Sequence, residues 1–269
     1  MDNRPIGFFD SGLGGLTTIP YLAQYLPEEK IVYFGDTART PYGSKAVSTI
    51  RQFSMQIAEF LKSQNVKMIV IACNTVTSTC LQLLKQKYPD IPVVGIIDPA
   101  AKKIAEVCTQ DNNIGIIGTK ATISNQAYET AVRNYKTGLS ISSVACPIFV
   151  PLIEEGIVSD EIMTLSIKHY LDSFITENSI DTLVLGCTHY PLIRKEIEKL
   201  YPELNIIDPS REIIERIYRV LSENDMLAKD SSFENTFYAS DLSDNFLNMI
   251  NTIFEGSNFR VAFKSFDIK

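Results

Sequence analysis

The feature that most constrains the fold of this chain is an internal duplication of a strand that ends in cysteine. Residues 60–73, FLKSQNVKMIVIAC, align without a gap on residues 174–187, FITENSIDTLVLGC. Each copy reads as a helix end, a turn, an aliphatic strand and a cysteine. The similarity continues upstream, where RPIGFFDSGLGG (4–15) resembles NNIGIIGTKAT (112–122), and downstream, where GIIDPA (95–100) resembles NIIDPS (205–210). We therefore expect two similar halves.

The pattern of each half is typical of βαβ units and a parallel sheet, because short apolar runs alternate with amphipathic helical stretches. Helical spacing is clearest over residues 49–64 and 165–178. The predicted strands are Ile6–Phe9, Ile31–Phe34, Met68–Ala72, Val93–Ile97, Ile114–Ile117, Ile141–Val144, Leu183–Gly186 and Asn205–Ile207. The fold class is accordingly α/β, with two similar domains.

The duplication also predicts the domain boundaries. One copy ends near residue 97 and the other occupies residues 98–207. The remaining tail contains FYAS (237–240) and a helical pattern over residues 245–256, and we expect it to pack back on the first half. The prediction is a first domain of residues 1–97 plus 208–269 and a second of residues 98–207.

The two cysteines at matching strand ends, Cys73 and Cys187, are the first candidates for function. Ligands of open α/β sheets bind beyond the carboxyl ends of the strands, and a cleft between two such domains is a common site for small molecules. The two thiols would then face each other across that cleft. The alternative is that a cysteine simply fills the core, and this is our interpretation of Cys80, Cys108 and Cys146.

Bulk properties narrow the class of protein. The 269 residues carry a formal net charge of −7 with scattered Lys and Arg, which does not favour binding to nucleic acid or membrane surfaces. The apolar runs are shorter than the about 20 residues that span a bilayer, and the N-terminus does not read as a signal peptide. We expect a cytoplasmic protein. The cysteines form no CxxC motif and the two histidines, His169 and His189, form no cluster with them, so we expect neither a disulfide scaffold nor a metal site.

Two glycine-containing motifs offer binding groups. DSGLGGLT (10–17) departs from the dinucleotide fingerprint at Thr17, and Asp10 would repel a pyrophosphate. Apart from serving as a tight turn, this loop offers the Asp10 carboxylate for a cation, the Ser11 hydroxyl and free N–H groups at a helix start. TPYGSK (40–45) predicts a turn whose successive N–H groups can form an anion-binding nest.

Hydrogen-bonding residues follow each cysteine: Asn74 and Thr75 after the first, Thr188 and His189 after the second. An imidazole two residues from Cys187 can tune its thiol or move its proton. Two thiols on opposite faces of one small ligand suit the inversion of a carbon stereocentre, because one removes a proton while the other delivers one. A carboxylate for an ammonium group, with N–H and hydroxyl donors for carboxylates, suits an acidic amino acid.

The ordered motifs DSGLGG, PYG, ACNT and GCTHYP resemble those of the glutamate racemases, and the resemblance covers essentially the entire chain, FYAS included. It implies interconversion of L- and D-glutamate without a cofactor, and supply of D-glutamate for peptidoglycan synthesis. It further implies two flavodoxin-like, three-layer domains related by pseudo-two-fold symmetry, with the site buried between them, and a homodimer.

The resemblance also implies roles for the residues of these motifs. Cys73 would deprotonate D-glutamate, Cys187 would deprotonate L-glutamate, and His189 would assist Cys187. Asp10 and Ser11 would hold the amino group, and Asp10 would also influence Cys73.

The remaining residues implied by the resemblance contact or surround the substrate. Tyr42 and Gly43 would meet the side-chain carboxylate through backbone N–H groups. The α-carboxylate and α-amino end would be bound by Asn74, Thr75 and Thr188, with a further carboxylate contact from Thr122. Asp36, in YFGDTA, and Glu154, in PLIEEG, match acidic positions near the site.

Three alternatives stay open from the sequence. One is a racemase for aspartate or another acidic amino acid, which turnover on both substrates would separate. Another is a two-domain binding module, whose ligand affinity would not need the two thiols. The last is a redox switch, in which Cys73 and Cys187 form a disulfide on mild oxidation, although the missing CxxC disfavours it.

Overall fold

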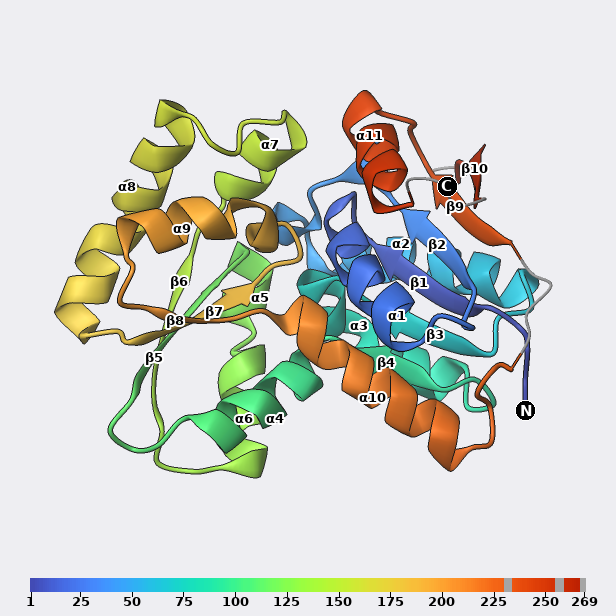
Figure 1. Cartoon of the computed structure of the whole chain (residues 1–269), viewed down its shortest axis with the longest axis horizontal. Coiled ribbons are helices and arrows are strands. Elements are labelled where there is room, and N and C mark those ends of the chain that lie inside the picture. The colour runs from blue at the N-terminus through green and yellow to red at the C-terminus, as the bar shows by residue number, and fades with distance from the viewer. Residues whose placement is uncertain (230–233, 255–258, 267–269) are drawn as a thin grey trace.

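A computed structural model of the chain describes residues 1–229, 234–254 and 259–266, and its strands form two parallel sheets (Figure 1). The first sheet contains, in spatial order, β10 (Phe259–Phe263), β9 (Asn235–Ala239), β2 (Ile31–Gly35), β1 (Ile6–Asp10), β3 (Met68–Ile71) and β4 (Val93–Gly95). The second contains β6 (Ser140–Ala145), β5 (Asn113–Gly118), β7 (Thr182–Gly186) and β8 (Asn205–Ile207).

Both sheets have the same strand order over their shared part. The sequence β2-β1-β3-β4 in the first corresponds to β6-β5-β7-β8 in the second, which is the doubly wound order of flavodoxin-like sheets. The cysteine-bearing strands β3 and β7 occupy equivalent places, each beside the first strand of its half. The predicted α/β class, with two similar parallel-sheet domains, is confirmed. Strands β9 and β10 extend the first sheet beyond β2.

Helices cover the sheets. They are α1 (Ile19–Tyr25), α2 (Val47–Ser63), α3 (Asn74–Lys87), α4 (Ile97–Val107), α5 (Lys120–Ser124), α6 (Ala127–Tyr135), α7 (Phe149–Glu154), α8 (Glu161–Asn178), α9 (Arg194–Leu200), α10 (Pro209–Glu223) and α11 (Asp244–Ile253). The helical patterns over 49–64 and 165–178 correspond to α2 and α8. The pattern over 245–256 corresponds to α11, except that residues 255 and 256 lie outside the described part of the chain.

Two predicted strands are too long: Met68–Ala72 exceeds β3 by one residue, and Val93–Ile97 exceeds β4 by two. The apolar pattern predicts a strand over Val93–Ile97, but β4 ends at Gly95 and α4 begins at Ile97. The first helical turn has no intrahelical use for its N–H groups, so Pro99 is tolerated there, and Asp98 interacts favourably with the positive end of the helix dipole. These two residues therefore start a helix where hydrophobicity alone suggests a continuing strand.

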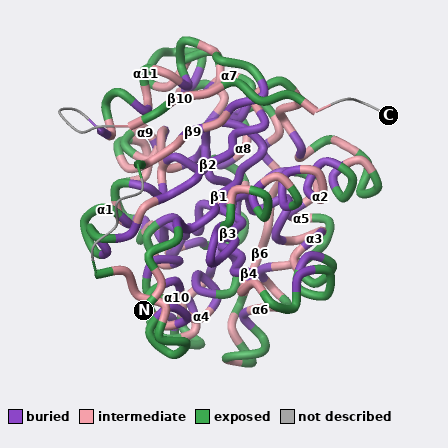
Figure 2. The backbone as a smooth tube through the Cα atoms, turned by 90° about the vertical axis from the view of Figure 1, so that its right-hand side faces the viewer, coloured by how far each residue is buried: buried purple, intermediate pink, exposed green. Residues whose placement is uncertain are grey.

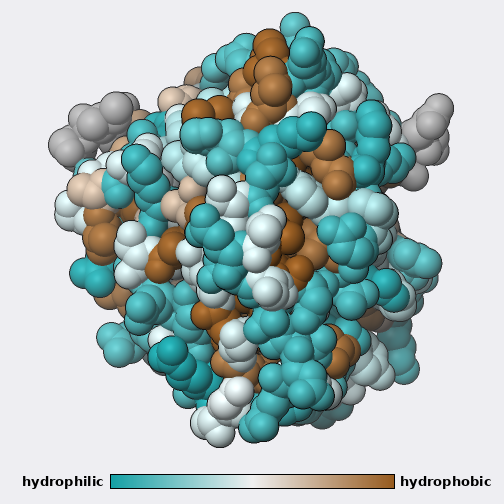
Figure 3. All heavy atoms as spheres, turned by 90° about the vertical axis from the view of Figure 1, so that its left-hand side faces the viewer, coloured by the Kyte–Doolittle hydropathy of each residue, from teal (hydrophilic) through white to brown (hydrophobic). Residues whose placement is uncertain are grey.

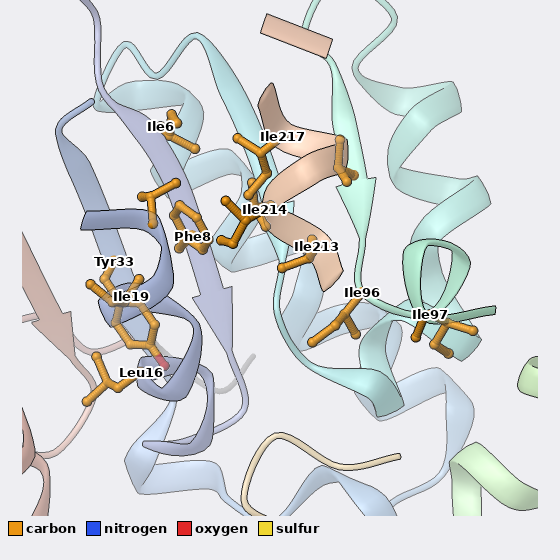
Figure 4. Close-up of a cluster of buried hydrophobic side chains, with 14 of the residues drawn as sticks. Ile6, Phe8, Leu16, Ile19, Tyr33, Ile96, Ile97, Ile213, Ile214 and Ile217 are labelled. Carbon is orange, nitrogen blue, oxygen red and sulfur yellow. The ribbon is translucent and has the colours of Figure 1, made fainter. Parts of the chain in front are cut away.

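Helix α10 covers one face of the first sheet and shows how its core is built. Ile213, Ile214 and Ile217 follow helical spacing and point toward Ile6 and Phe8 of β1 (Figure 4). Figure 2 shows buried residues concentrated on the strands, with exposed residues on the outer faces of the helices. A helix that follows the second sheet in sequence thus packs on the first.

The face on the left of Figure 1 is shown in Figure 3, where hydrophobic side chains lie in separate groups among hydrophilic ones. Such scattered apolar surface is ordinary for globular proteins. None of the helices in the described ranges has the length and apolar character needed to cross a membrane.

Candidate active site

The strand ends that carry the two cysteines meet at one cavity. Cys73 follows β3 and precedes the first residue of α3, whereas Cys187 follows β7 directly. Both are nearly buried, with 4% and 6% of their surfaces exposed. The cavity is lined by Ser11, Pro41, Tyr42, Gly43, Cys73, Asn74, Thr75, Thr119, Val150, Cys187, Thr188 and His189. The two thiols therefore share one enclosed space between the sheets.

Cys73 lies among hydroxyl and backbone groups. Its thiol donates a hydrogen bond to Ser11 Oγ at 3.5 Å, and it stands at the N-terminus of α3. Burial raises the pKa of Cys73 well above its ordinary value, and the nearby Asp10 carboxylate raises it further. The Ser11 hydroxyl and the Val76 N–H oppose this rise. Without a bound cation Cys73 is thus a protonated thiol, and the groups that stabilise its thiolate are already in place.

Cys187 lies next to an imidazole instead. Its Sγ is 3.8 Å from His189 Nδ1, and His189 Nε2 is 2.6 Å from Glu154 Oε1. Burial lowers the pKa of His189, but the contacts with Cys187 and Glu154 more than offset it and raise the pKa to about 10. Glu154, His189 and Cys187 thus form a chain in which a positive imidazolium faces the sulfur.

Asp10 connects the two halves at the edge of the site. This fully buried carboxylate accepts hydrogen bonds from the Gly12 N–H at 3.0 Å and from the Thr188 hydroxyl at 3.1 Å. Burial raises the pKa of Asp10, while the charge of His189 and these donors oppose the rise. The end of β1 is thereby joined to the residues that follow β7.

Asn74 is held in place by the second half. Its Oδ1 accepts a hydrogen bond from the Tyr128 hydroxyl at 2.6 Å. Within the described part of the chain, no acceptor pairs with its buried Nδ2. A buried donor without a partner is costly, so this N–H group is available to a carboxylate in the cavity.

Thr119 lines the cavity and was not predicted from the sequence. Its hydroxyl is 2.8 Å from that of Thr75 and 3.0 Å from that of Thr122. Thr122 itself is buried beside Thr119 and is not among the lining residues. A signal for Thr119 exists, since it aligns with Ser11 when the two copies of the duplication are superposed. Pro41 and Val150 also line the cavity without having been predicted.

Glycines allow the two halves to approach closely. A Cβ atom at Gly14 would lie 2.5 Å from His189 Nδ1, and one at Gly43 would lie 2.4 Å from the Cβ of Thr119. Both distances are shorter than real Cβ contacts allow. The DSGLGG and PYG motifs therefore provide space for the opposite wall of the cavity.

Asp36 and Glu154 lie one contact away from the cavity. Asp36 is fully buried and accepts a hydrogen bond from the Tyr42 hydroxyl, and Glu154 contacts His189.

All five cysteines are free and buried. No three His, Cys, Asp or Glu side chains in residues 1–229, 234–254 and 259–266 gather as metal ligands. The arrangement supplies acid–base groups and hydrogen-bond donors around one small cavity.

Comparison with known proteins gives consistent likenesses. The family model "Asp/Glu/Hydantoin racemase" matches residues 19–217. A glutamate racemase of Sulfurihydrogenibium sp. is 45% identical over 217 residues, 80% of this chain and 82% of that protein. The glutamate racemase of Geobacter metallireducens is 40% identical over 258 residues, 95% of this chain and 94% of that protein. The crystal structure of a Francisella tularensis glutamate racemase in complex with D-glutamate matches over the whole of both chains, with 38% identity and a TM-score of 0.90.

Proposed function

This chain belongs to the glutamate racemase family, and on that premise we propose that it interconverts L- and D-glutamate through its two thiols, without a cofactor. The observation that carries the proposal is that Cys73 and Cys187, one from each sheet, line one cavity. The activity supplies D-glutamate for peptidoglycan synthesis in the cytoplasm, as the family resemblance implies.

The proposed step exchanges one proton for another. With L-glutamate bound, the Cys187 thiolate takes the α-proton, so the C–H bond breaks and an S–H bond forms. The Cys73 thiol then gives its proton to the opposite face of the α-carbon and becomes the thiolate. With D-glutamate bound the same transfers run in reverse, starting from Cys73. The enclosed cavity keeps water away from the carbanionic intermediate.

The groups around each thiol can stabilise its thiolate when that thiol acts as the base. The imidazolium of His189, held by Glu154, stabilises the Cys187 thiolate. The Ser11 hydroxyl and the N-terminus of α3 stabilise the Cys73 thiolate. The substrate ammonium adds a positive charge beside both sulfurs, which favours ionisation further.

Substrate binding uses the other groups that line the cavity or lie beside it. Asp10 with Ser11 takes the ammonium group. Backbone N–H groups of the PYG turn take the side-chain carboxylate. The α-carboxylate and α-amino end meet donors from both halves, which are Asn74, Thr75, Thr188 and, through its contact with Thr119, Thr122.

The test is isotope exchange with the reduced protein. L-Glutamate is incubated with the enzyme in deuterated water, circular dichroism follows the loss of optical activity and NMR follows deuterium at the α-carbon. We expect both signals, with deuterium entering the D-product before it enters recovered L-glutamate, because separate groups serve the two faces. A folded, reduced protein that gives neither signal contradicts the proposal.

Cysteine variants test the assignment of the bases. Cys73→Ser and Cys187→Ser should each lower turnover by at least roughly 100-fold, since a hydroxyl is a far weaker acid than a thiol. Cys80→Ser is the matched control, because Cys80 is a buried cysteine on α3 that lies outside the cavity. A fully active Cys73 or Cys187 variant would reassign that residue to packing.

We further propose a homodimer and the domain division 1–97 plus 208–269 against 98–207. Light scattering coupled to gel filtration tests the dimer, and a monomeric mass for the active enzyme contradicts it.

Faster turnover of aspartate than of glutamate would change the substrate assigned to the same mechanism.

A further inference from the structure

We propose that Ser240, which follows strand β9 of the C-terminal tail, is a positioning residue for the cavity wall formed by Tyr42 and Gly43, and that it acts through Asp36. The proposal rests on the racemase activity proposed above and assigns that activity a residue outside the cavity.

The Ser240 hydroxyl uses both of its hydrogen-bonding roles on one short segment. It donates to Asp36 Oδ1 at 2.7 Å and accepts from the Ala38 N–H at 3.0 Å. The Ser240 N–H also donates to the Gly35 carbonyl at 3.1 Å, which continues the pairing of β9 with β2. Ser240 is 7% exposed. Its side chain thus fixes both a carboxylate and a backbone amide.

Asp36 carries this contact to the cavity. Its Oδ2 accepts the hydrogen bond from the Tyr42 hydroxyl, and Arg39 Nε contacts its two oxygens at 2.9 and 2.7 Å. The Arg39 guanidinium lies 3.9 Å from the centre of the Phe53 ring, which holds it in turn. The carboxylate is fully buried, so its orientation is set by these donors.

A second contact strengthens the connection. The Thr37 hydroxyl donates to the Asp241 carbonyl at 2.5 Å and accepts from the Asp241 N–H at 2.8 Å. Residues 36–38 are therefore held by a segment 204 residues further along the chain. The same stretch leads directly into Tyr42 and Gly43, which line the cavity.

The kinetic signature follows from where this wall lies. Tyr42 and Gly43 are proposed to bind the substrate carboxylate, whereas the thiols stand on other elements, after β3 and β7. Losing the Ser240 contact should misplace the binding wall and leave the thiols where they are. We expect Ser240→Ala to raise KM for both enantiomers by roughly 10-fold while kcat changes less than about 3-fold.

The experiment measures kcat and KM in both directions, with thermal unfolding of each full-length variant. Ser240→Thr keeps the hydroxyl and should restore KM. Thr236→Ala is the matched control: its hydroxyl is on the same tail strand but bonds the Glu234 carbonyl, and its KM should equal that of the wild type. Ser240→Cys has a similar shape and only a weak donor, so it should raise KM in the same direction and replaces Ser240→Ala if that variant does not fold.

A double-mutant cycle with Asp36→Asn tests the route. Because Ser240 acts through Asp36, the combined variant should raise KM by less than the product of the two single effects. An unchanged KM in Ser240→Ala, no rescue by threonine, or fully multiplicative effects would overturn the proposal. A wild-type protein inactive on glutamate would instead overturn the proposed function, so the two failures are distinct.

Discussion

The two thiols have unequal surroundings although the duplication gives them equivalent places. Counting from each cysteine, Asn74 matches Thr188 and Thr75 matches His189. Cys73 therefore has hydroxyl neighbours, while Cys187 has an imidazole paired with Glu154. The difference comes from Ser11 beside Cys73 and from His189 with Glu154 beside Cys187, in two halves with the same strand order.

The charge on His189 gives a prediction about pH. Glu154→Gln removes one of the contacts that raise the pKa of His189, so the ring should lose its proton at a lower pH. We expect the alkaline limb of the kcat/KM profile for L-glutamate to move down by about 1 pH unit. Nitrogen-15 NMR of the ring checks this directly, with His169→Asn as the control that assigns the two histidines. An unmoved alkaline limb together with an unmoved ring titration would contradict the role given to Glu154.

The same group links folding to pH. The folded-state pKa of about 10 lies above the ordinary value of 6.5, so protonation of His189 favours the folded state. This contribution is fully present below pH 6.5 and is lost as the pH rises toward 10.

At this scale, the residues that can be predicted from the sequence are those that the duplication or a motif marks. The two thiols, Cys73 and Cys187, were expected at strand ends, and these strand ends meet at one cavity. Thr119 was not predicted, although the alignment with Ser11 contains that signal. Contacts such as that between Asp36 and Ser240 span 204 residues and leave no local pattern, so only the folded chain reveals them.

At the scale of elements, strands and long helices were predicted well because their apolar spacing reflects burial on one or both faces. The end of β4 was not predicted correctly, because Asp98 and Pro99 begin a helix within an apolar run. Strands β9 and β10 were not predicted. Only two of the five residues of β9 are buried, and none of those of β10 is, so the apolar pattern of each strand is weak.

The turn that carries Gly43 gives the prediction at this scale. Gly43→Ala places a Cβ 2.4 Å from the Cβ of Thr119, which is too rigidly attached to move aside. The cavity wall must shift, and we expect kcat/KM to fall by at least about 10-fold with the fold retained. Ser44→Ala, exposed in the same turn, is the control. Wild-type kinetics in Gly43→Ala would contradict this prediction. They would show that the two halves can move apart to accommodate the added Cβ beside Thr119 without loss of activity.

At the scale of the whole molecule, a buried ion pair connects segments that are distant in the sequence. Lys67 Nζ is 2.6 Å from Glu29 Oε2 and donates to the carbonyls of Asp2 and Met226 at 2.7 Å each. Both charged side chains are almost fully buried. The ammonium group thus joins the N-terminal segment, the start of β3 and the segment after α10.

Removing this ammonium leaves the buried Glu29 carboxylate without its charged partner. Lys67→Met should lower the free energy of unfolding by about 3–5 kcal/mol, and the double variant with Glu29→Leu should recover part of that loss. Urea denaturation of the two variants measures the effect. Lys30→Met is the control, because Lys30 follows Glu29 in the sequence but is half-buried, and its Nζ donates to the Pro27 carbonyl at 3.5 Å. A loss below about 1 kcal/mol in Lys67→Met would mean that the pair adds no more than a surface ion pair does.

The two sulfurs have different surroundings, and the equilibrium between the enantiomers limits what this difference can do to the kinetics. Mirror-image amino acids have identical free energies in water, so their equilibrium ratio is one and the specificity constants of the forward and reverse reactions must be equal. The contacts that His189 makes beside Cys187 therefore cannot give the enzyme a higher specificity constant for one enantiomer of glutamate than for the other. They can change the size of that shared constant equally in both directions, and how the constant divides between the speed of turnover and the concentration of substrate at half-saturation.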